Sequence, residues 1–241
     1  AKTVRATSIS ASLIDVLDCL CLLLILSSGP SKRLHKHCCW VTLELHKVKG
    51  QITKGTQKMQ SLSICVFCGS RSGKKPAYED AAIELGQGLA ERKWRLVYGA
   101  GDVGIMGRVA QTVQQNVAKA LGVIPTHLME KEVAKTDLNN LIVTENMHER
   151  KKVMFMNSDA IILLPGGAGS LDEFFEVLTW AQIGLHDKPI ILVNTAQYWT
   201  PLTELIDHII SQDFAEITLR SLFDVVDTPE EALHIINQRL D

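Results

Sequence analysis

Residues 159–173 read DAIILLPGGAGSLDE, and this stretch decides the fold. The apolar run 160–164 has the length and composition of a buried strand. Pro165 ends that run, and three glycines among the next four residues predict a tight turn before a helix that begins at Leu171. A helix N-terminus presents unpaired amide groups and the positive end of the helix dipole. The stretch therefore predicts a phosphate-binding turn between a strand and a helix.

Strand patterns alternate with amphipathic helix patterns from residue 60 to the end of the chain. The expected strands are Ser63–Phe67, Arg95–Tyr98, Ala120–Ile124, Leu141–Thr144, Ala160–Leu164, Pro189–Val193 and Leu222–Val226. The expected helices are Pro76–Glu91, Val103–Val117, Asn146–Asn157, Leu171–Ile183, Thr200–Ser211 and Pro229–Arg239. Several strands are continuous apolar runs, as expected for parallel strands covered on both faces. The pattern predicts an α/β fold, namely a single doubly wound Rossmann-like domain with a mostly parallel sheet.

The first 58 residues differ from the rest of the chain. They contain an apolar patch, Cys19–Leu26, and a basic segment rich in histidine and cysteine, Lys32–Cys39. A signal peptide, a metal site in the basic segment and a dispensable extension are the three interpretations. We favour the extension, because Met59 immediately precedes the first expected strand. The predicted organisation is an unassigned extension, 1–58, followed by one Rossmann-type domain, 59–241.

The composition excludes several classes of protein. A formal net charge of −2 gives no basic footprint of the kind that nucleic-acid binding requires. We find no apolar stretch of the roughly 20 residues that cross a membrane. Four of the six cysteines lie in the first forty residues, so they do not form a disulfide framework for the domain. We expect a cytoplasmic protein with no nucleic-acid or membrane partner.

Two further turns follow expected strands. The first is Cys68-Gly69-Ser70-Arg71, which offers backbone amides, a hydroxyl and a guanidinium. The second runs from Tyr98 to Gly104 and contains three glycines. In doubly wound sheets ligands bind beyond the carboxyl ends of the strands, so the turns are expected to converge on one crevice. Each turn taken separately is equally consistent with an ordinary connection.

Glu173 and Arg150 are the candidate chemical groups. Ser170 and Glu173 have the spacing of a capping box, so Glu173 has a structural interpretation as well as a functional one. Arg150 begins a basic cluster at the start of a helix, where cations are unfavourable, and its planar guanidinium suits phosphate or carboxylate. A solvated helix face is the alternative. Cys65 and Cys68 have C-x-x-C spacing, but a strand is the wrong context for redox chemistry.

Together these segments resemble the Lonely Guy (LOG) family of cytokinin riboside 5′-monophosphate phosphoribohydrolases, many formerly labelled lysine decarboxylase-like. The family pattern P-G-G-x-G-T-x-x-E is matched by Pro165–Glu173, and M-x-x-R-K is matched by Met147–Lys151. Ile64–Ser70 and Thr179–Gln182 also look like family segments. The resemblance runs from about residue 62 to the C-terminus and covers nothing before Met59.

The resemblance implies hydrolysis of the N-glycosidic bond of N6-modified adenosine 5′-monophosphates, without a metal or other cofactor. It implies that Arg150 and Glu173 are catalytic and that the partner of the site is a small-molecule nucleotide. It also implies a homodimer or a higher homo-oligomer. The implied substrate-binding residues are Gly69, Ser70, Glu132, Lys151, Gly166, Gly167, Ala168, Gly169, Ser170, Leu171, Asp172 and Thr179.

The chain departs from the family pattern at three positions. Ser170 replaces threonine, Ala100 stands where a glycine is usual, and Asp102 replaces a small hydroxyl residue. Two rival functions remain open: a general nucleosidase for AMP or other nucleotide monophosphates, and a non-catalytic carrier or sensor of a nucleotide or phosphate-bearing cofactor. Lysine decarboxylation is the weakest alternative, because neither Lys151 nor Lys152 lies in a recognisable pyridoxal phosphate setting.

Overall fold

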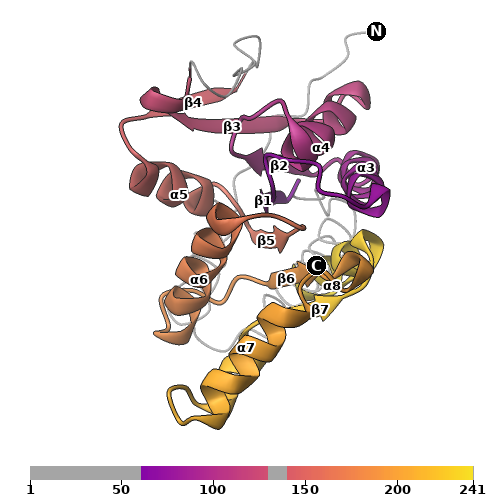
Figure 1. The fold of residues 1–241 in the computed structure, drawn as a ribbon. Helices are drawn as coiled ribbons and strands as arrows, with labels where there is room; N and C mark the ends of the chain where they lie inside the picture. Colours follow the sequence, from indigo (N-terminus) through magenta and orange to yellow (C-terminus); the bar gives the residue numbers. More distant parts are fainter. Residues whose placement is uncertain (1–60, 130–139, 241) are drawn as a thin grey trace, which may run out of the picture. The chain divides into compact units, whose positions relative to one another are not determined.

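The computed structural model of the chain describes residues 61–129 and 140–240. Within this part, seven parallel strands form one sheet in the order β4-β3-β2-β1-β5-β6-β7 (Figure 1). The strands are β1 (Ser63–Phe67), β2 (Arg95–Tyr98), β3 (Ala120–Pro125), β4 (Leu141–Thr144), β5 (Ala160–Leu163), β6 (Ile190–Val193) and β7 (Asp224–Val226). The α-helices are α3 (Pro76–Glu91), α4 (Gly104–Gln115), α5 (Met147–Met156), α6 (Ala168–Gln182), α7 (Thr200–Ser211) and α8 (Pro229–Leu240), with 3-10 turns η1 (Thr126–Leu128), η2 (Thr195–Gln197) and η3 (Ile217–Leu222). The predicted α/β fold with a parallel sheet is confirmed.

Helices cover both faces of the sheet, and β1 shows why its sequence is apolar from Ile64 to Phe67. Successive side chains of a strand point to opposite faces. Ile64 and Val66 pack in the core beneath α3, α4 and α8, while Cys65 and Phe67 pack in the core beneath α5, α6 and α7. In Figure 1 the first group of helices lies to the right of the sheet, and α5 and α6 lie to its left. A strand buried on both faces has no position for a solvated side chain.

The strand order reverses between β1 and β5. The chain builds β2, β3 and β4 on one side of β1 and then returns to place β5 on the other side. At such a reversal, the connections that follow the two central strands lead to helices on opposite faces of the sheet, and a crevice lies at the carboxyl ends of the strands. The register pairs Phe67 with Leu163, so the loops after β1 and β5 begin side by side.

The start of α6 differs from the sequence expectation. We predicted Ser170 as the N-cap, but the helix begins at Ala168 and Gly167 is its N-cap. Ser170 is the third residue of the helix and Glu173 the sixth, so the capping-box interpretation of Glu173 is wrong. The reason is that the two glycines 166 and 167 complete the turn by themselves, and the next residues already have helical geometry.

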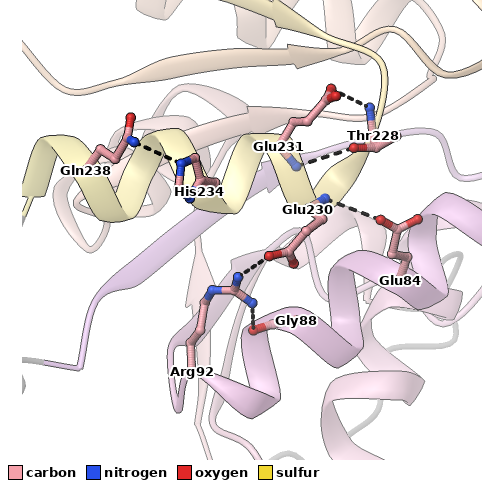
Figure 2. A network of polar contacts seen from close by, with 8 residues as sticks. All are labelled: Glu84, Gly88, Arg92, Thr228, Glu230, Glu231, His234 and Gln238. Atoms are coloured by element: carbon pink, nitrogen blue, oxygen red, sulfur yellow. Dashed lines mark hydrogen bonds and ion pairs between the residues drawn. The ribbon is translucent and has the colours of Figure 1, made fainter.

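A true capping box begins α8. The Thr228 hydroxyl accepts a hydrogen bond from the Glu231 amide (3.3 Å), and Glu231 accepts one from the Thr228 amide (3.3 Å), as Figure 2 shows. Beside it, Arg92 at the end of α3 donates to Glu230 of α8 (2.5 Å) and to the Gly88 carbonyl (3.2 Å). These polar contacts border the apolar contact between α3 and α8, where Leu233 is fully buried.

We expect the apolar part of this contact to determine its stability. The Glu230 side chain is 60% exposed, so Glu230→Gln should lower the free energy of unfolding by less than about 1 kcal/mol. Leu233→Ala, which empties a buried site, should lower it by about 2–5 kcal/mol. Urea denaturation of the two variants and the wild type measures both effects. Equal losses of unfolding free energy in the two variants would contradict the view that the apolar part of the contact determines its stability.

The loop between β2 and α4 contains two residues in the left-handed region. Gly104 has φ +62°, and a Cβ atom there would collide with the backbone of Ser70 and Arg71 in the loop after β1. Ala100 also has φ +62°, although alanine is strained in this conformation. Glycine is therefore required at 104 to bring the two loops together, whereas position 100 holds a residue that its backbone disfavours.

Opposite substitutions at these two positions should have opposite effects. Ala100→Gly removes left-handed strain and should raise the free energy of unfolding by about 1 kcal/mol. Gly104→Ala adds both strain and a collision, and should lower it by more than about 2 kcal/mol. Thermal and urea unfolding measure both changes. A destabilised Ala100→Gly variant would show that the entropy of the unfolded chain outweighs the strain.

Candidate active site

A cavity of about 540 Å³ lies at the strand reversal. The loops that follow β1 and β5 form two of its walls, and the starts of α4 and α5 and the turn after β6 complete it. Its lining residues are Cys68, Gly69, Ser70, Arg71, Ser72, Gly73, Tyr78, Ile105, Met106, Leu128, Met147, Arg150, Pro165, Gly166, Gly167, Ala168, Gly169, Ser170, Asp172, Glu173 and Tyr198.

The glycine turn after β5 packs directly against the loop after β1. The Gly69 amide donates to the Pro165 carbonyl (3.0 Å), and a Cβ atom on Gly69 would lie 3.2 Å from the Gly166 Cα. Gly166 in turn has the buried Ser170 side chain against it, where a Cβ atom would collide with the hydroxyl. Larger residues at 69 or 166 would push the loops apart, which explains the glycines.

The N-terminus of α6 presents backbone amides to this cavity. The first intrahelical hydrogen bond runs from the Leu171 amide to the Gly167 carbonyl (3.2 Å). The amides of Ala168, Gly169 and Ser170 precede it, and all three residues line the cavity. Amides at this position, together with the helix dipole, favour a bound phosphate.

Arg150 enters the cavity from the first turns of α5. The Asn146 side chain caps this helix by accepting from the Glu149 amide (3.0 Å). The guanidinium of Arg150 donates to the carbonyl of Gly99 (2.7 Å), directly after β2, and to that of Val123 (3.1 Å), within β3. A Cβ atom at position 99 would overlap this guanidinium, so a glycine is needed there.

Lys151 lies next to Arg150 in sequence but has a different environment. Its ammonium group lies 3.0 Å from Asp172 and 3.1 Å from Glu176, both on α6. Burial lowers the pKa of Lys151, but hydrogen bonds and charge from the two carboxylates outweigh it, so that the pKa is raised overall. Arg150 and Lys151 are 4% and 6% exposed, so the alternative of a solvated basic face is wrong for both.

Glu173 lines the same cavity, and its charge acts on the buried thiol of Cys68, which also lines it. Burial raises the pKa of the Cys68 thiol, the charge of Glu173 raises it further, and the charge of Arg150 lowers it. The carboxylate and the guanidinium are therefore both within electrostatic range of one buried atom. Cys65 and Cys68 are free and buried, and their raised pKa values disfavour the thiolate that redox chemistry needs.

The structure brings most of the expected site residues together. The cavity lining includes both expected catalytic residues, Arg150 and Glu173, and the expected binding residues Gly69, Ser70, Gly166, Gly167, Ala168, Gly169, Ser170 and Asp172. Lys151, Leu171 and Thr179 are not among the lining residues. Glu132 lies outside the described residues. Asp102 and Ala100 are also not among the lining residues, and Asp102 accepts a hydrogen bond from Gln111 of α4 (3.2 Å).

Sequence reasoning missed several side chains of the cavity. Tyr198 comes from the turn after β6 and had no motif to indicate it. The apolar lining residues Tyr78, Ile105, Met106 and Leu128 were not expected in the site, and Met147 was noted only as the first residue of M-x-x-R-K. Among residues 61–129 and 140–240, no group of His, Cys, Asp and Glu side chains has the arrangement of a metal site. No helix within these ranges is both long and apolar enough to span a membrane.

Comparison with known proteins identifies the family. A family model described as "Possible lysine decarboxylase" matches residues 106–236. A cytokinin riboside 5′-monophosphate phosphoribohydrolase of Arabidopsis thaliana is 42% identical over 185 residues, which cover 77% of this chain and 85% of that protein. A protein of Oryza sativa subsp. japonica named "probable" cytokinin riboside 5′-monophosphate phosphoribohydrolase is 43% identical over 175 residues, covering 73% of this chain and 72% of that protein.

Solved structures agree with the fold. The molybdenum cofactor binding protein of the phototrophic bacterium Rippkaea orientalis matches with a TM-score of 0.58 and 22% identity, over 76% of this chain and 100% of that one. At this identity the likeness shows the fold alone. The sequence relatives carry the assignment, and the chain belongs to the LOG family of cytokinin riboside 5′-monophosphate phosphoribohydrolases.

Proposed function

We propose that this chain hydrolyses the N-glycosidic bond of cytokinin riboside 5′-monophosphates, giving the free base and ribose 5-phosphate. The observation that carries the proposal is one cavity that combines the α6 amides with Arg150 and Glu173. The names of the sequence relatives support the same reaction. The substrate is a small-molecule nucleotide, and no cofactor enters the proposed chemistry.

The two ends of the cavity suit the two ends of such a nucleotide. Ile105 and Met106 follow β2, Leu128 follows β3 and Met147 follows β4, so these apolar side chains come from one side of the strand reversal. The amides of 168–170 follow β5 on the other side. The phosphate is proposed to bind at the amides and the N6-modified base at the apolar end, which places the sugar between them.

The proposed reaction breaks the bond between C1′ of the ribose and N9 of the base. The electron pair of that bond leaves with the base, which takes up a proton, and water supplies a hydroxyl group to C1′. As in glycoside hydrolysis, positive charge develops on the sugar during this step. Glu173 stabilises that charge and orients the attacking water or accepts its proton. Arg150 holds the nucleotide in register, since two backbone carbonyls fix its guanidinium.

The other expected binding residues are proposed to act less directly. Lys151 holds the Asp172 carboxylate by an ion pair (3.0 Å) and so acts through it. Leu171 contributes through its place in the first turns of α6, and Thr179 through the same helix. We also propose that Glu132 contacts the nucleotide, on the family pattern alone.

Three alternatives compete with this proposal. A general nucleosidase for AMP would use the same groups, and only the shape of the apolar end separates the two. A carrier or sensor would need the anion site but not the pair Arg150 and Glu173. Lysine decarboxylation would need a lysine amine free to form a Schiff base. Lys151 is ion-paired with two carboxylates that help to keep it protonated, which argues against that role.

We further propose that residues 59–241 form the catalytic domain, in a cytoplasmic protein that is a homodimer or a higher homo-oligomer. Exposed apolar side chains support self-association, since large exposed apolar groups often mark interfaces. The most exposed of those that follow α6 and α7 are Ile183 (64%), Leu185 (67%), Phe214 (86%) and Ile217 (71%), the last of which begins η3.

Product analysis tests the reaction. Purified protein is incubated separately with AMP and with isopentenyladenosine 5′-monophosphate, and release of each free base is followed by chromatography. We expect preferential release of isopentenyladenine, because the apolar end of the cavity favours an apolar N6 substituent. Equal or greater release of adenine would indicate the general nucleosidase. Release of neither base, with nucleotide still bound, would indicate a carrier or sensor.

A conservative substitution tests the role of Glu173. Glu173→Gln removes the charge that the sugar cation needs and should lower kcat by at least about 100-fold. The variant should still fold, which thermal unfolding checks, because α6 begins at Gly167 and does not depend on a capping box at Glu173. Glu204→Gln, on the exposed face of α7, is the matched control and should retain full turnover. Wild-type turnover in Glu173→Gln would exclude the residue from the chemistry.

A further inference from the structure

Tyr198 connects a separate part of the fold to the phosphate turn. It lies in the turn between β6 and α7, and its hydroxyl donates to the carbonyl of Gly166 (2.5 Å). The side chain also lines the cavity and is 38% exposed. No motif in the sequence marks this turn, and the proposed reaction does not use it.

The turn that carries Tyr198 is strained and held in place. Ala196 and Gln197 have φ of 54° and 63°, a left-handed conformation that costs about 1–2 kcal/mol for each non-glycine residue. Asn194 holds the turn closed: its side chain accepts from the Trp199 amide (2.6 Å) and donates to Gln197 (3.2 Å). Backbone strain of this kind persists where surrounding contacts maintain it, and it gathers near functional sites.

The ring of Tyr198 is fixed as well as its hydroxyl. It packs edge to face with Tyr78 of α3 at 5.4 Å between ring centroids and with Trp199 at 4.7 Å. Lys75, which precedes α3, donates to the Ala196 carbonyl (3.4 Å). Contacts from α3 and from its own turn therefore hold the phenol against the Gly166 carbonyl.

We propose that Tyr198 is a positioning residue for the phosphate turn. A peptide group is planar, so a hydrogen bond that fixes the Gly166 carbonyl also fixes the direction of the Gly167 amide in the same peptide. That peptide immediately precedes the amides of α6 that face the anion. The bond therefore sets the geometry in which those amides receive a phosphate. The inference rests on the proposed function for its substrate but concerns the binding of the phosphate rather than the chemical step.

The test compares ligands with and without a phosphate. Tyr198→Phe removes the hydroxyl and keeps the ring, so its packing against Tyr78 and Trp199 is retained. Calorimetry measures the Kd of ribose 5-phosphate and of free adenine for the wild type and the variant. The Kd of ribose 5-phosphate should rise about threefold to tenfold, the usual range for loss of one hydrogen bond, while the Kd of adenine should not change. With a substrate nucleotide, KM should rise by the same factor and kcat should stay within about twofold.

Thr203→Val is the matched control. It removes a hydroxyl that donates to a backbone carbonyl, that of Thr200 (2.8 Å), in α7 away from the cavity lining. This variant should bind both ligands like the wild type. An unchanged Kd of ribose 5-phosphate in Tyr198→Phe would overturn the proposal. Equal weakening of both ligands, or a fall in kcat without a change in KM, would also overturn it, because a general structural role predicts such results.

Binding also separates this inference from the proposed reaction. Ribose 5-phosphate affinity is measured without turnover, so a chain that releases no base still gives an answer about Tyr198. A wild-type chain that binds no ribose 5-phosphate would overturn both proposals. Asn194→Ala should raise the Kd of ribose 5-phosphate through the same contact. The Kd of the double variant with Tyr198→Phe should therefore be no higher than that of the single variant that binds less tightly. A Kd that rises in the double variant by the product of the two single factors would show that Asn194 does not act through Tyr198.

Discussion

The hydrogen bond from the Gly69 amide to the Pro165 carbonyl joins the loops that follow β1 and β5. These strands are neighbours at the one place where the strand order reverses, and the cavity opens there. The Gly69 carbonyl also accepts from the Met106 amide (3.1 Å), so one residue ties together three connections. Such close approach of main chains leaves no room for side chains, which is why glycines recur at the contacts. The proposed anion site depends on this arrangement, because the hydrogen bond sets where α6 begins relative to the loop after β1.

Two adjacent cations in α5 illustrate how charge is distributed around the cavity. Lys151 is buried against two carboxylates of α6, which offset its charge and fasten α5 to α6. The two backbone carbonyls that hold Arg150 carry no net charge, so those bonds orient the guanidinium without neutralising it. The sequence alone presents the two residues as one basic cluster.

The sequence predicted the strands well because burial on both faces leaves continuous apolar runs, as in β1 and β5. It also predicted that glycine turns would meet, because parallel strands end at the same edge of a sheet. The start of α6 was wrong because Ser170–Glu173 and Thr228–Glu231 have the same capping-box spacing, and only the second has the bonds. Local spacing cannot distinguish them, because the glycines before Ser170 let the helix begin earlier.

The sequence could not predict the position of Tyr198 in the cavity, for a different reason. Its position depends on left-handed geometry at Ala196 and Gln197, neither of which is a glycine that would indicate it. Asn194 maintains that geometry through contacts that are visible only in three dimensions. The apolar lining of the cavity was missed in a similar way, because methionine and isoleucine at helix starts look the same whether they face a core or a ligand.

The support of Arg150 by backbone carbonyls has a consequence for how this site can diverge among related proteins. Every residue has a carbonyl, so the bond to Val123 survives replacement of that side chain. Gly99 is the sensitive position, since any side chain there would displace the guanidinium. Neither of the two carbonyls that hold Arg150 belongs to Leu128, an apolar residue that also lines the cavity. Under the proposed function, a lineage can therefore vary position 128 to change which base it accepts while it keeps the backbone support of Arg150.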